Sequence, residues 1–189
     1  MAGAVVWLTG IPGSGKTTLA DALYARLSEL GIQSYVLDGD RLRGGLCSGL
    51  GLDKESRVEN VRRTYEVALL MAQAGLVAVC AIISPYASGR EDARKRIEDS
   101  GKPFFEIHVD CPVEVCRKRD PKGLYEKHRR GDIKGLTGVD APYEPPIGLH
   151  LRLRTDLQDV DKCVNRIVSF IIQSDGWHMD MTPGEMIRF

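Results

Sequence analysis

The sequence predicts an α/β fold in which helices cover both faces of a mostly parallel β-sheet. Short apolar runs rich in β-branched residues alternate with segments of helical periodicity, as expected of consecutive βαβ units. A length of 189 residues is enough for one such domain with a sizeable core and is short for two. We therefore expect a single domain over residues 1–174, followed by a C-terminal tail over residues 175–189.

Each expected element in the first half of the chain has a local sequence signal. Residues 5–8 and 33–37 are short apolar runs with the length and composition of buried strands. Between them, residues 17–30 follow helical spacing and end at a glycine, a residue that commonly closes helices. A second helical pattern over residues 59–74 places its apolar side chains on one face and also stops at a glycine.

The second half of the chain continues this alternation. Residues 76–83 form an almost unbroken apolar run, which is typical of a central strand buried on both faces. The remaining expected elements are a charged helix, a strand, a short helix, a strand and a final helix, at residues 90–100, 104–109, 113–119, 149–154 and 160–173.

Residues 10–17 read GIPGSGKT and match a complete phosphate-binding-loop motif. The motif lies between an expected strand and an expected helix, where backbone N–H groups and a helix N-terminus converge on anionic oxygens. Lys16 can reach the β- and γ-phosphates of a nucleoside triphosphate, and Thr17 can offer its hydroxyl to Mg²⁺. The residues expected to hold this nucleotide are Gly10, Gly13, Ser14, Gly15, Lys16, Thr17 and Thr18.

Residues 120–148 are rich in Gly, Pro, Lys and Arg and have no apolar periodicity. An irregular segment of this length in a compact domain is usually functional or disordered. Beside a phosphate-binding loop, a basic segment interrupted by glycines is typical of a lid that closes over the phosphates of the substrates. The alternative interpretation is a solvated surface loop.

The composition argues against several classes of partner. Lys plus Arg equals Asp plus Glu at 26 each, so no overall charge favours nucleic acid or an anionic membrane surface. The five cysteines are odd in number, scattered and without a CxxC pair, which disfavours a disulfide framework or a zinc site. Neither a signal peptide nor a membrane span is recognisable, so we expect a soluble, cytoplasmic protein.

Polar side chains follow two of the expected strands. Asp38 and Asp40 come directly after residues 33–37, and Ser84 follows residues 76–83. Ligands of doubly wound sheets bind outside the carboxyl ends of the strands. Carboxylates two residues apart lie on one side of an extended chain, so one can hold Mg²⁺ through water while the other faces an acceptor hydroxyl. A simple Asp-Gly-Asp turn is the alternative, and the neighbouring phosphate-binding loop favours the functional interpretation.

Several basic and amide side chains come next in the sequence, at Arg43, Arg57, Asn60, Arg62 and Arg63. Arg57 and Asn60 are three residues apart and share a helical face, whereas Arg62 and Arg63 cannot both share it. Arginine forks match the oxygens of phosphate and sulfate, so part of this group can hold a second anionic substrate while the others are solvated.

The chain also carries longer sequence blocks in a fixed order. They read GIPGSGKTT, LDGDRLRGGL, RVENVRR, AIISPY and RDPKGLYEKHRRGDIKGLTGVDAPYEPP. Over about residues 4–170 this order resembles the adenylylsulfate (APS) kinase family. The resemblance implies a P-loop NTPase fold of the nucleoside-kinase type with a lid, and commonly a homodimer. It further implies an ATP- and Mg²⁺-dependent phosphotransferase of sulfate assimilation that phosphorylates the 3′-hydroxyl of APS, an alcohol acceptor, to give PAPS.

The same resemblance implies a role for each position that matches a family motif. Asp40 matches the acidic group near the acceptor hydroxyl, and Ser84 matches a serine that carries phosphate in some members. Arg119 resembles the arginine that covers the base of ATP. The implied catalytic residues are Lys16, Asp38, Asp40 and Ser84, with Thr17 and Asp38 at the metal. The implied substrate-binding residues are Asp40, Arg43, Leu52, Arg57, Asn60, Ile83, Ser84, Pro85, Tyr86, Lys122, Lys127 and Leu136.

The chain departs from the family pattern near the acceptor. Gly44 and Cys47 stand where the family usually has His and Asn, and Leu52 and Leu136 replace two phenylalanines that clamp the adenine of APS. Base–aromatic stacking is worth about 1–3 kcal/mol per base in single-strand binders, whereas leucine offers apolar contact alone. Some members of the family phosphorylate a cytidine diphosphate derivative (cytidine diphosphoramidate) instead, and this is the alternative acceptor that the resemblance implies, because a base site without the clamp suits a smaller pyrimidine. A regulatory nucleotide-binding module without turnover is disfavoured because the catalytic side chains and a lid-like segment are all present.

Overall fold

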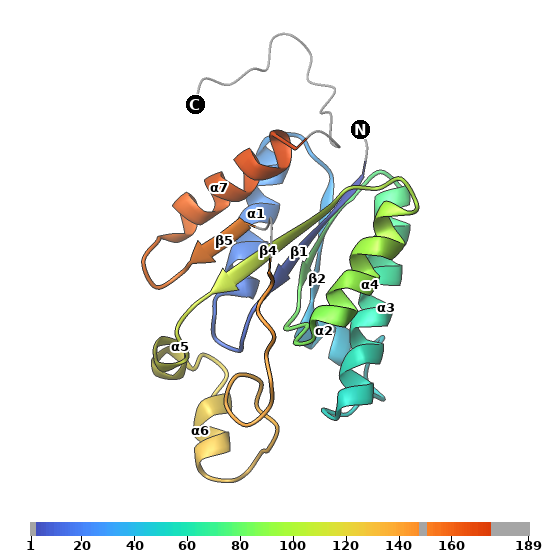
Figure 1. The fold of residues 1–189 in the computed structure, drawn as a ribbon. Helices are drawn as coiled ribbons and strands as arrows, with labels where there is room; N and C mark the ends of the chain where they lie inside the picture. The colour runs from blue at the N-terminus through green and yellow to red at the C-terminus, as the bar shows by residue number, and fades with distance from the viewer. Residues whose placement is uncertain (1–2, 148–150, 175–189) are drawn as a thin grey trace.

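The computed structural model describes residues 3–147 and 151–174, and in these ranges it has a five-stranded sheet between two layers of helices (Figure 1). The strands are β1 Ala4–Thr9, β2 Ser34–Asp38, β3 Val77–Ala81, β4 Phe104–Asp110 and β5 Leu151–Arg154. Their order across the sheet is β2-β3-β1-β4-β5, and each neighbouring pair is parallel. The predicted α/β fold with a parallel sheet is confirmed. The tail expected at residues 175–189 and the first two residues of the last expected strand lie outside the described residues.

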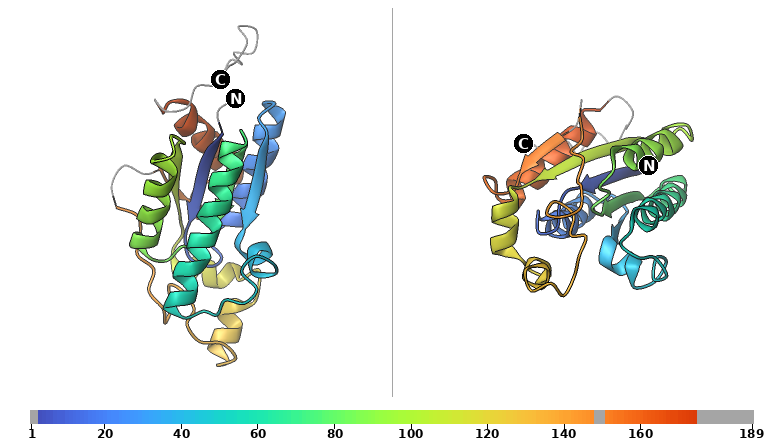
Figure 2. Two further views of the ribbon diagram at one scale, coloured as in Figure 1. Left: turned by 90° about the vertical axis from the view of Figure 1, so that its right-hand side faces the viewer. Right: turned by 60° about the horizontal axis from the view of Figure 1, so that its bottom comes forward.

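Helices cover the sheet on both sides. Those of the described chain are α1 Lys16–Glu29, α2 Gly39–Arg43, α3 Lys54–Gln73, α4 Ala87–Glu98, α5 Val113–Arg119, α6 Leu124–Arg129 and α7 Val160–Ile172. Helices α1 and α7 lie on one face, and α3 and α4 lie on the other (Figures 1 and 2). No helix within the described ranges is long and apolar enough to cross a membrane.

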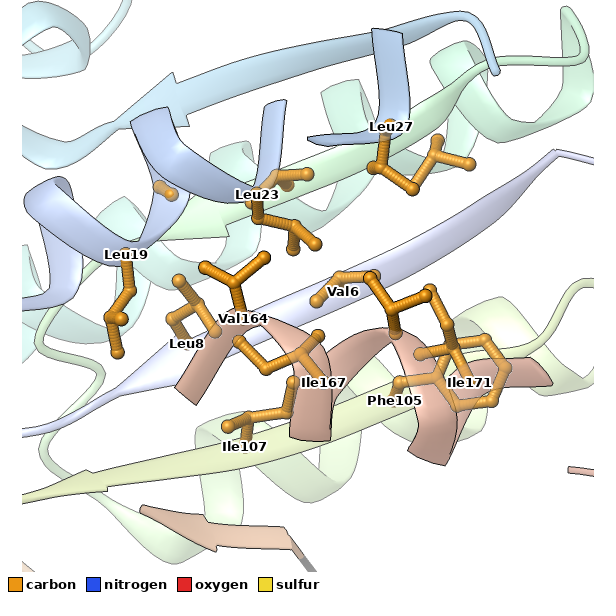
Figure 3. Close-up of a cluster of buried hydrophobic side chains, with 14 of the residues drawn as sticks. Val6, Leu8, Leu19, Leu23, Leu27, Phe105, Ile107, Val164, Ile167 and Ile171 are labelled. Carbon is orange, nitrogen blue, oxygen red and sulfur yellow. The ribbon is translucent and has the colours of Figure 1, made fainter. Parts of the chain in front are cut away.

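Alternate residues of β1 enter two separate cores, one on each face of the sheet. On the side of α1 and α7, Val6 and Leu8 pack among Leu23 and Ile167 (Figure 3). On the opposite side, Trp7 is fully buried in the core formed with α3 and α4. Each buried aliphatic or aromatic side chain contributes about 1.5–3 kcal/mol, so β1 is firmly fixed at the centre of the sheet.

Local side-chain caps explain two differences from the prediction, while α4 also begins earlier than expected, at Ala87 rather than at residue 90. The five-residue helix α2 was not predicted, and it forms because Asp38 Oδ1 accepts the N–H groups of Asp40 at 2.9 Å and Arg41 at 3.4 Å. Helix α3 begins at Lys54 rather than at residue 59, since Asp53 Oδ1 accepts the N–H of Ser56 at 2.8 Å. Apolar periodicity does not register such caps.

The expected irregular segment at residues 120–148 is partly helical, so this prediction was wrong in part. Helix α6 lies inside it because Asp120 accepts the N–H groups of Tyr125 at 3.1 Å and Glu126 at 3.0 Å. The buried hydroxyl of Tyr125 donates to the carbonyl oxygen of Pro12 at 2.8 Å. The segment is therefore partly helical and packed on the phosphate-binding loop, and we refer to residues 120–147 as the lid, after the role expected from the sequence.

Candidate active site

A cavity of about 720 Å³ lies at the carboxyl ends of β1, β2 and β3. Its lining comes from the phosphate-binding loop, the first turns of α2 and α3, the loop after β3, the end of α5, the lid, and the segment from β5 into α7. This position is the expected ligand site of a doubly wound sheet. The cavity therefore brings the phosphate-binding loop and the polar groups of the strand ends to one place.

The phosphate-binding loop follows β1 and ends at the N-terminus of α1. Gly13 and Gly15 have φ values of 75° and 103°, in the left-handed region that favours glycine. A Cβ added at Gly13 would also lie 3.0 Å from the carbonyl oxygen of Cys116, so α5 approaches the loop closely. These two glycines let the backbone N–H groups turn toward the start of α1.

Lys16 is buried and folds back over its own loop. Its Nζ donates to the carbonyl oxygens of Gly10 and Ile11, both at 2.9 Å. Burial and, secondarily, the positive charge of Lys122 lower the pKa of Lys16 to about 8. The ammonium group is thus held next to the loop, with a reduced preference for its charged form.

Thr17 and Asp38 meet beside the phosphate-binding loop. Thr17 Oγ1 donates to Asp38 Oδ2 at 2.8 Å, while Asp38 Oδ1 caps α2. Hard hydroxyl and carboxylate oxygens are the ligands that Mg²⁺ prefers, and it usually takes only one or two from the protein beside those of substrate phosphates. The oxygens of Thr17 and Asp38 therefore fit an ion held jointly by protein and substrate.

Asp40 and Lys122 form an ion pair across the cavity, one from α2 and one from the lid. Both side chains are about half or more exposed, at 64% and 49%. The carboxylate of Asp40 is therefore reachable from the cavity, and the lid is in contact with it.

Arg57 and Asn60 lie on the first turns of α3 and are both buried at the cavity. Arg57 Nε donates to the carbonyl oxygen of Leu52 at 2.6 Å, and its Nη2 donates to that of Gly135 at 2.5 Å. Its Nη1 also donates to the hydroxyl of Thr137. Asn60 Nδ2 has no hydrogen-bond partner within the described chain. A buried donor without a partner costs about 1–3 kcal/mol, which a polar ligand would remove.

The two leucines that replace the expected aromatic clamp differ in exposure. Leu52 is 54% exposed, whereas Leu136 is 6% exposed and packs with Tyr125 of the lid and Cys116 of α5. Both line the same cavity, and Arg43 lines it beside Leu52. Arg43 Nη1 donates to the carbonyl oxygen of Gly51 at 3.1 Å. Leu52 is therefore the more exposed of the two cavity-lining leucines.

The loop after β3 forms one wall of the cavity through Ile83, Ser84 and Pro85. Ser84 is 2% exposed and has a φ of 40°, which is uncommon for a residue with a side chain. Its Oγ accepts a hydrogen bond from the indole Nε1 of Trp7 at 3.1 Å. The serine hydroxyl is thus engaged with a core side chain, a contact that no sequence signal had indicated.

Some expected site residues do not line this cavity. Within the described chain, Gly10, Ser14, Tyr86 and Lys127 are absent from its lining. Gly10 and Ser14 are buried inside the phosphate-binding loop, and the ring of Tyr86 lies 5.9 Å from Lys54 Nζ.

The side of the cavity near Arg119 includes residues that the sequence analysis had missed. Arg119 lines it, as expected, and donates to the carbonyl oxygen of Thr155 at 2.6 Å. Thr155 Oγ1 donates to the carbonyl oxygen of Ser14 at 2.7 Å, and Gln158 and Asp159 line the same side. The sequence feature that could have identified these residues is their place just after the last strand of a parallel sheet.

Comparison with known proteins agrees with this geometry. The family model described as adenylylsulphate kinase matches residues 2–154. An adenylyl-sulfate kinase of Clostridium acetobutylicum is 49% identical over 171 residues, which cover 90% of this chain and 84% of the relative. A probable adenylyl-sulfate kinase of Halalkalibacterium halodurans is 50% identical over 167 residues, which cover 88% of this chain and 82% of the relative.

Solved structures give the same result. The APS kinase of Mycobacterium tuberculosis in complex with AMPPNP and APS is 44% identical, with a TM-score of 0.86 over 89% of this chain and 96% of that one. A hexameric APS kinase from Thiobacillus denitrificans is 35% identical, with a TM-score of 0.67 over 88% of this chain and 28% of that one. The matches cover the phosphate-binding loop, the strand ends and the lid together. The chain therefore belongs to the adenylylsulphate kinase family.

Proposed function

We propose that this protein transfers the γ-phosphoryl group of ATP to the 3′-hydroxyl of APS, giving PAPS and ADP for sulfate assimilation. One observation carries the proposal: a single cavity is lined by a complete phosphate-binding loop, by a second group of basic and amide side chains, and by Asp40. Phosphoryl transfer asks little more of a protein than in-line positioning and neutralisation of charge. The relatives named above support APS as the acceptor.

The donor end binds ATP through the phosphate-binding loop and the start of α1. In this proposal Lys16 exchanges the carbonyl oxygens of Gly10 and Ile11 for β- and γ-phosphate oxygens, and its charge stabilises the transferred group. Arg119 lines the cavity beside Thr155 and covers the base of ATP.

Thr17 and Asp38 would hold Mg²⁺ at the phosphates. Their oxygens already lie 2.8 Å apart, and both residues line the cavity next to the loop. When bound, the ion supplies positive charge against the phosphate oxygens. The protein's own part is to present the two oxygens and to hold Asp38 rigidly through the cap of α2.

The acceptor end places the 3′-hydroxyl of APS near Asp40. The carboxylate of Asp40 orients this hydroxyl and takes its proton as the oxygen attacks the γ-phosphorus, and ADP leaves on the opposite side. Arg43, Arg57 and Asn60 hold the phosphosulfate and the ribose, and the unpartnered Asn60 Nδ2 gains an acceptor. Once its ion pair with Asp40 is broken, Lys122 contacts the anionic groups of the substrates.

A cytidine diphosphate acceptor receives no support beyond the two leucines. Leu136 packs against Tyr125 of the lid and Cys116 of α5, and the adenylyl-sulfate kinase relatives favour APS.

We also propose that the protein is a homodimer, on the family resemblance. A cytoplasmic location is proposed because the five cysteines are all free and buried.

The acceptor is tested by ADP release from ATP with APS or cytidine diphosphate derivatives in separate assays. We expect rapid APS-dependent release, and little release with Lys16→Ala, because that change removes charge from the transferred phosphoryl group. Faster release with a cytidine derivative than with APS would contradict the assignment. Near-normal release by Lys16→Ala would contradict the role of the phosphate-binding loop.

Asp40→Asn should lower kcat for APS about a hundredfold or more while changing the KM for MgATP little, since the lost group acts on the acceptor hydroxyl. Asp132→Asn is the matched control, because Asp132 is an exposed lid carboxylate paired with Arg130 at 2.9 Å. It should behave like the unmodified protein. If Asp40→Asn changed only the apparent Mg²⁺ affinity, the roles proposed for Asp38 and Asp40 would have to be exchanged.

The pKa of Lys16 predicts a pH dependence of ATP capture. The free enzyme needs a charged Lys16, so kcat/KM for MgATP should fall as pH rises above about 8. Bound phosphates favour the ammonium form, so kcat at saturating substrates should stay flat over the same range. In Lys122→Met the fall should move to higher pH, because the charge of Lys122 lowers this pKa. A kcat/KM that stays level well above this pH would refute the assignment to Lys16.

Leu52→Phe should lower the KM for APS about fivefold, because an aromatic ring at this exposed position adds roughly 1 kcal/mol of stacking on the acceptor base. The KM for MgATP should not change. Leu136→Phe is the comparison: its site is buried, so overpacking should cost about 1–3 kcal/mol of stability, measured by urea unfolding. An unchanged KM for APS in folded Leu52→Phe would place Leu52 outside the base site.

A further inference from the structure

The guanidinium of Arg90 joins three segments that are far apart in the sequence. Arg90 lies in the first turn of α4 and is 2% exposed. Its Nε donates to Glu106 Oε1 on β4, its Nη1 to the carbonyl oxygen of Ser84, and its Nη2 to that of Glu144, each at 2.7 Å. One planar side chain therefore connects a central strand, the loop after β3 and the end of the lid.

The end of the lid is held against the same loop by further contacts. This segment is the orange chain that leads away from α6 in Figure 1. Glu144 donates its N–H to the carbonyl oxygen of Pro85 at 2.8 Å, and its Oε2 accepts the N–H of Ala87 at 2.7 Å. The hydroxyl of Tyr143 lies 3.1 Å from Thr9 Oγ1, within hydrogen-bond distance. The lid therefore ends on the wall of the cavity.

The wall itself contains the unusual backbone of Ser84. A φ of 40° persists in a residue with a side chain only where its surroundings fix it. Thr9 Oγ1 donates to the carbonyl oxygen of Ile83 at 2.7 Å, and Arg90 donates to that of Ser84. The hydrogen bonds that Arg90 donates to the carbonyl oxygens of Ser84 and Glu144 therefore connect the strained Ser84 to the lid.

We propose that Arg90 is a positioning residue for the acceptor side of the cavity. It holds Ile83, Ser84 and Pro85 in one geometry with the end of the lid, without itself lining the cavity in the described chain. The wall follows β3, which pairs with β2, the strand that leads to Asp40. This proposal rests on the proposed function, because it takes APS as the molecule that contacts the wall.

The role needs the shape of arginine as well as its charge. Three acceptors in three directions require a rigid planar fork, whereas lysine is a point charge on a flexible stem. Arg94 provides a matched control on the same carboxylate. Its Nη2 donates to Glu106 Oε2 at 2.8 Å, and its guanidinium lies over the ring of Phe104 at 5.2 Å.

The test compares Arg90→Lys with Arg94→Lys, the same change at two arginines that share Glu106. In Arg90→Lys we expect kcat/KM for APS to fall at least tenfold, with the KM for MgATP within twofold of the unmodified protein. In Arg94→Lys both should stay within twofold. Without substrates, hydrogen exchange at the amide of Glu144 should be at least tenfold faster in Arg90→Lys only. Equal effects of the two changes, or unaltered kinetics in Arg90→Lys, would overturn the proposal.

A second variant keeps the test decisive if Arg90→Lys does not fold. Tyr143→Phe removes the hydroxyl that contacts Thr9 and loosens the same segment, so the KM for APS should rise at least threefold with that for MgATP unchanged. An unchanged KM for APS would overturn the proposal. If the unmodified protein does not phosphorylate APS, the proposed function fails. The exchange rate at Glu144 then still decides whether Arg90 fixes the wall.

Discussion

The structure depends on one constraint: the phosphate-binding loop must leave a strand that cannot move. Strand β1 lies between β3 and β4, and its side chains are buried on both faces of the sheet. The loop then turns through the left-handed Gly13 and Gly15 into α1, whose apolar side packs back on the same strand. Because both ends of the loop are fixed by packing, its N–H groups are oriented before any phosphate arrives, which lowers the entropic cost of binding.

Several cationic groups of the cavity contact protein oxygens in this structure. Lys16 contacts carbonyl oxygens of its own loop, Lys122 contacts Asp40, and Arg57 contacts the lid. Substrate binding on the proposed function therefore exchanges protein–protein hydrogen bonds for protein–substrate ones. The net gain is a difference between similar terms, so it is sensitive to the exact placement of the anions. Such exchanges therefore contribute more to discrimination between ligands than to the affinity for any one ligand.

The sequence predicted the sheet, its parallel character and most helices, because apolar periodicity and glycine stops reflect burial directly. It could not predict α2, the early start of α3, or α6, because each depends on one aspartate accepting nearby N–H groups. Most site residues that the motifs predicted line the cavity at the strand ends. Within the described chain, the exceptions are Gly10, Ser14, Tyr86 and Lys127. The Trp7–Ser84 contact spans 77 residues of sequence, and no local pattern reports a pair that only the folded sheet brings together.

Asp38 uses its two carboxylate oxygens for different purposes. Oδ1 accepts N–H groups at the start of α2, and Oδ2 accepts the hydroxyl of Thr17. An asparagine could keep the first contact, but it would present an amide N–H₂ to the hydroxyl and remove the negative charge. On the proposed function, a substitution at position 38 therefore disturbs the start of α2, the contact with Thr17 at the metal, or both at once.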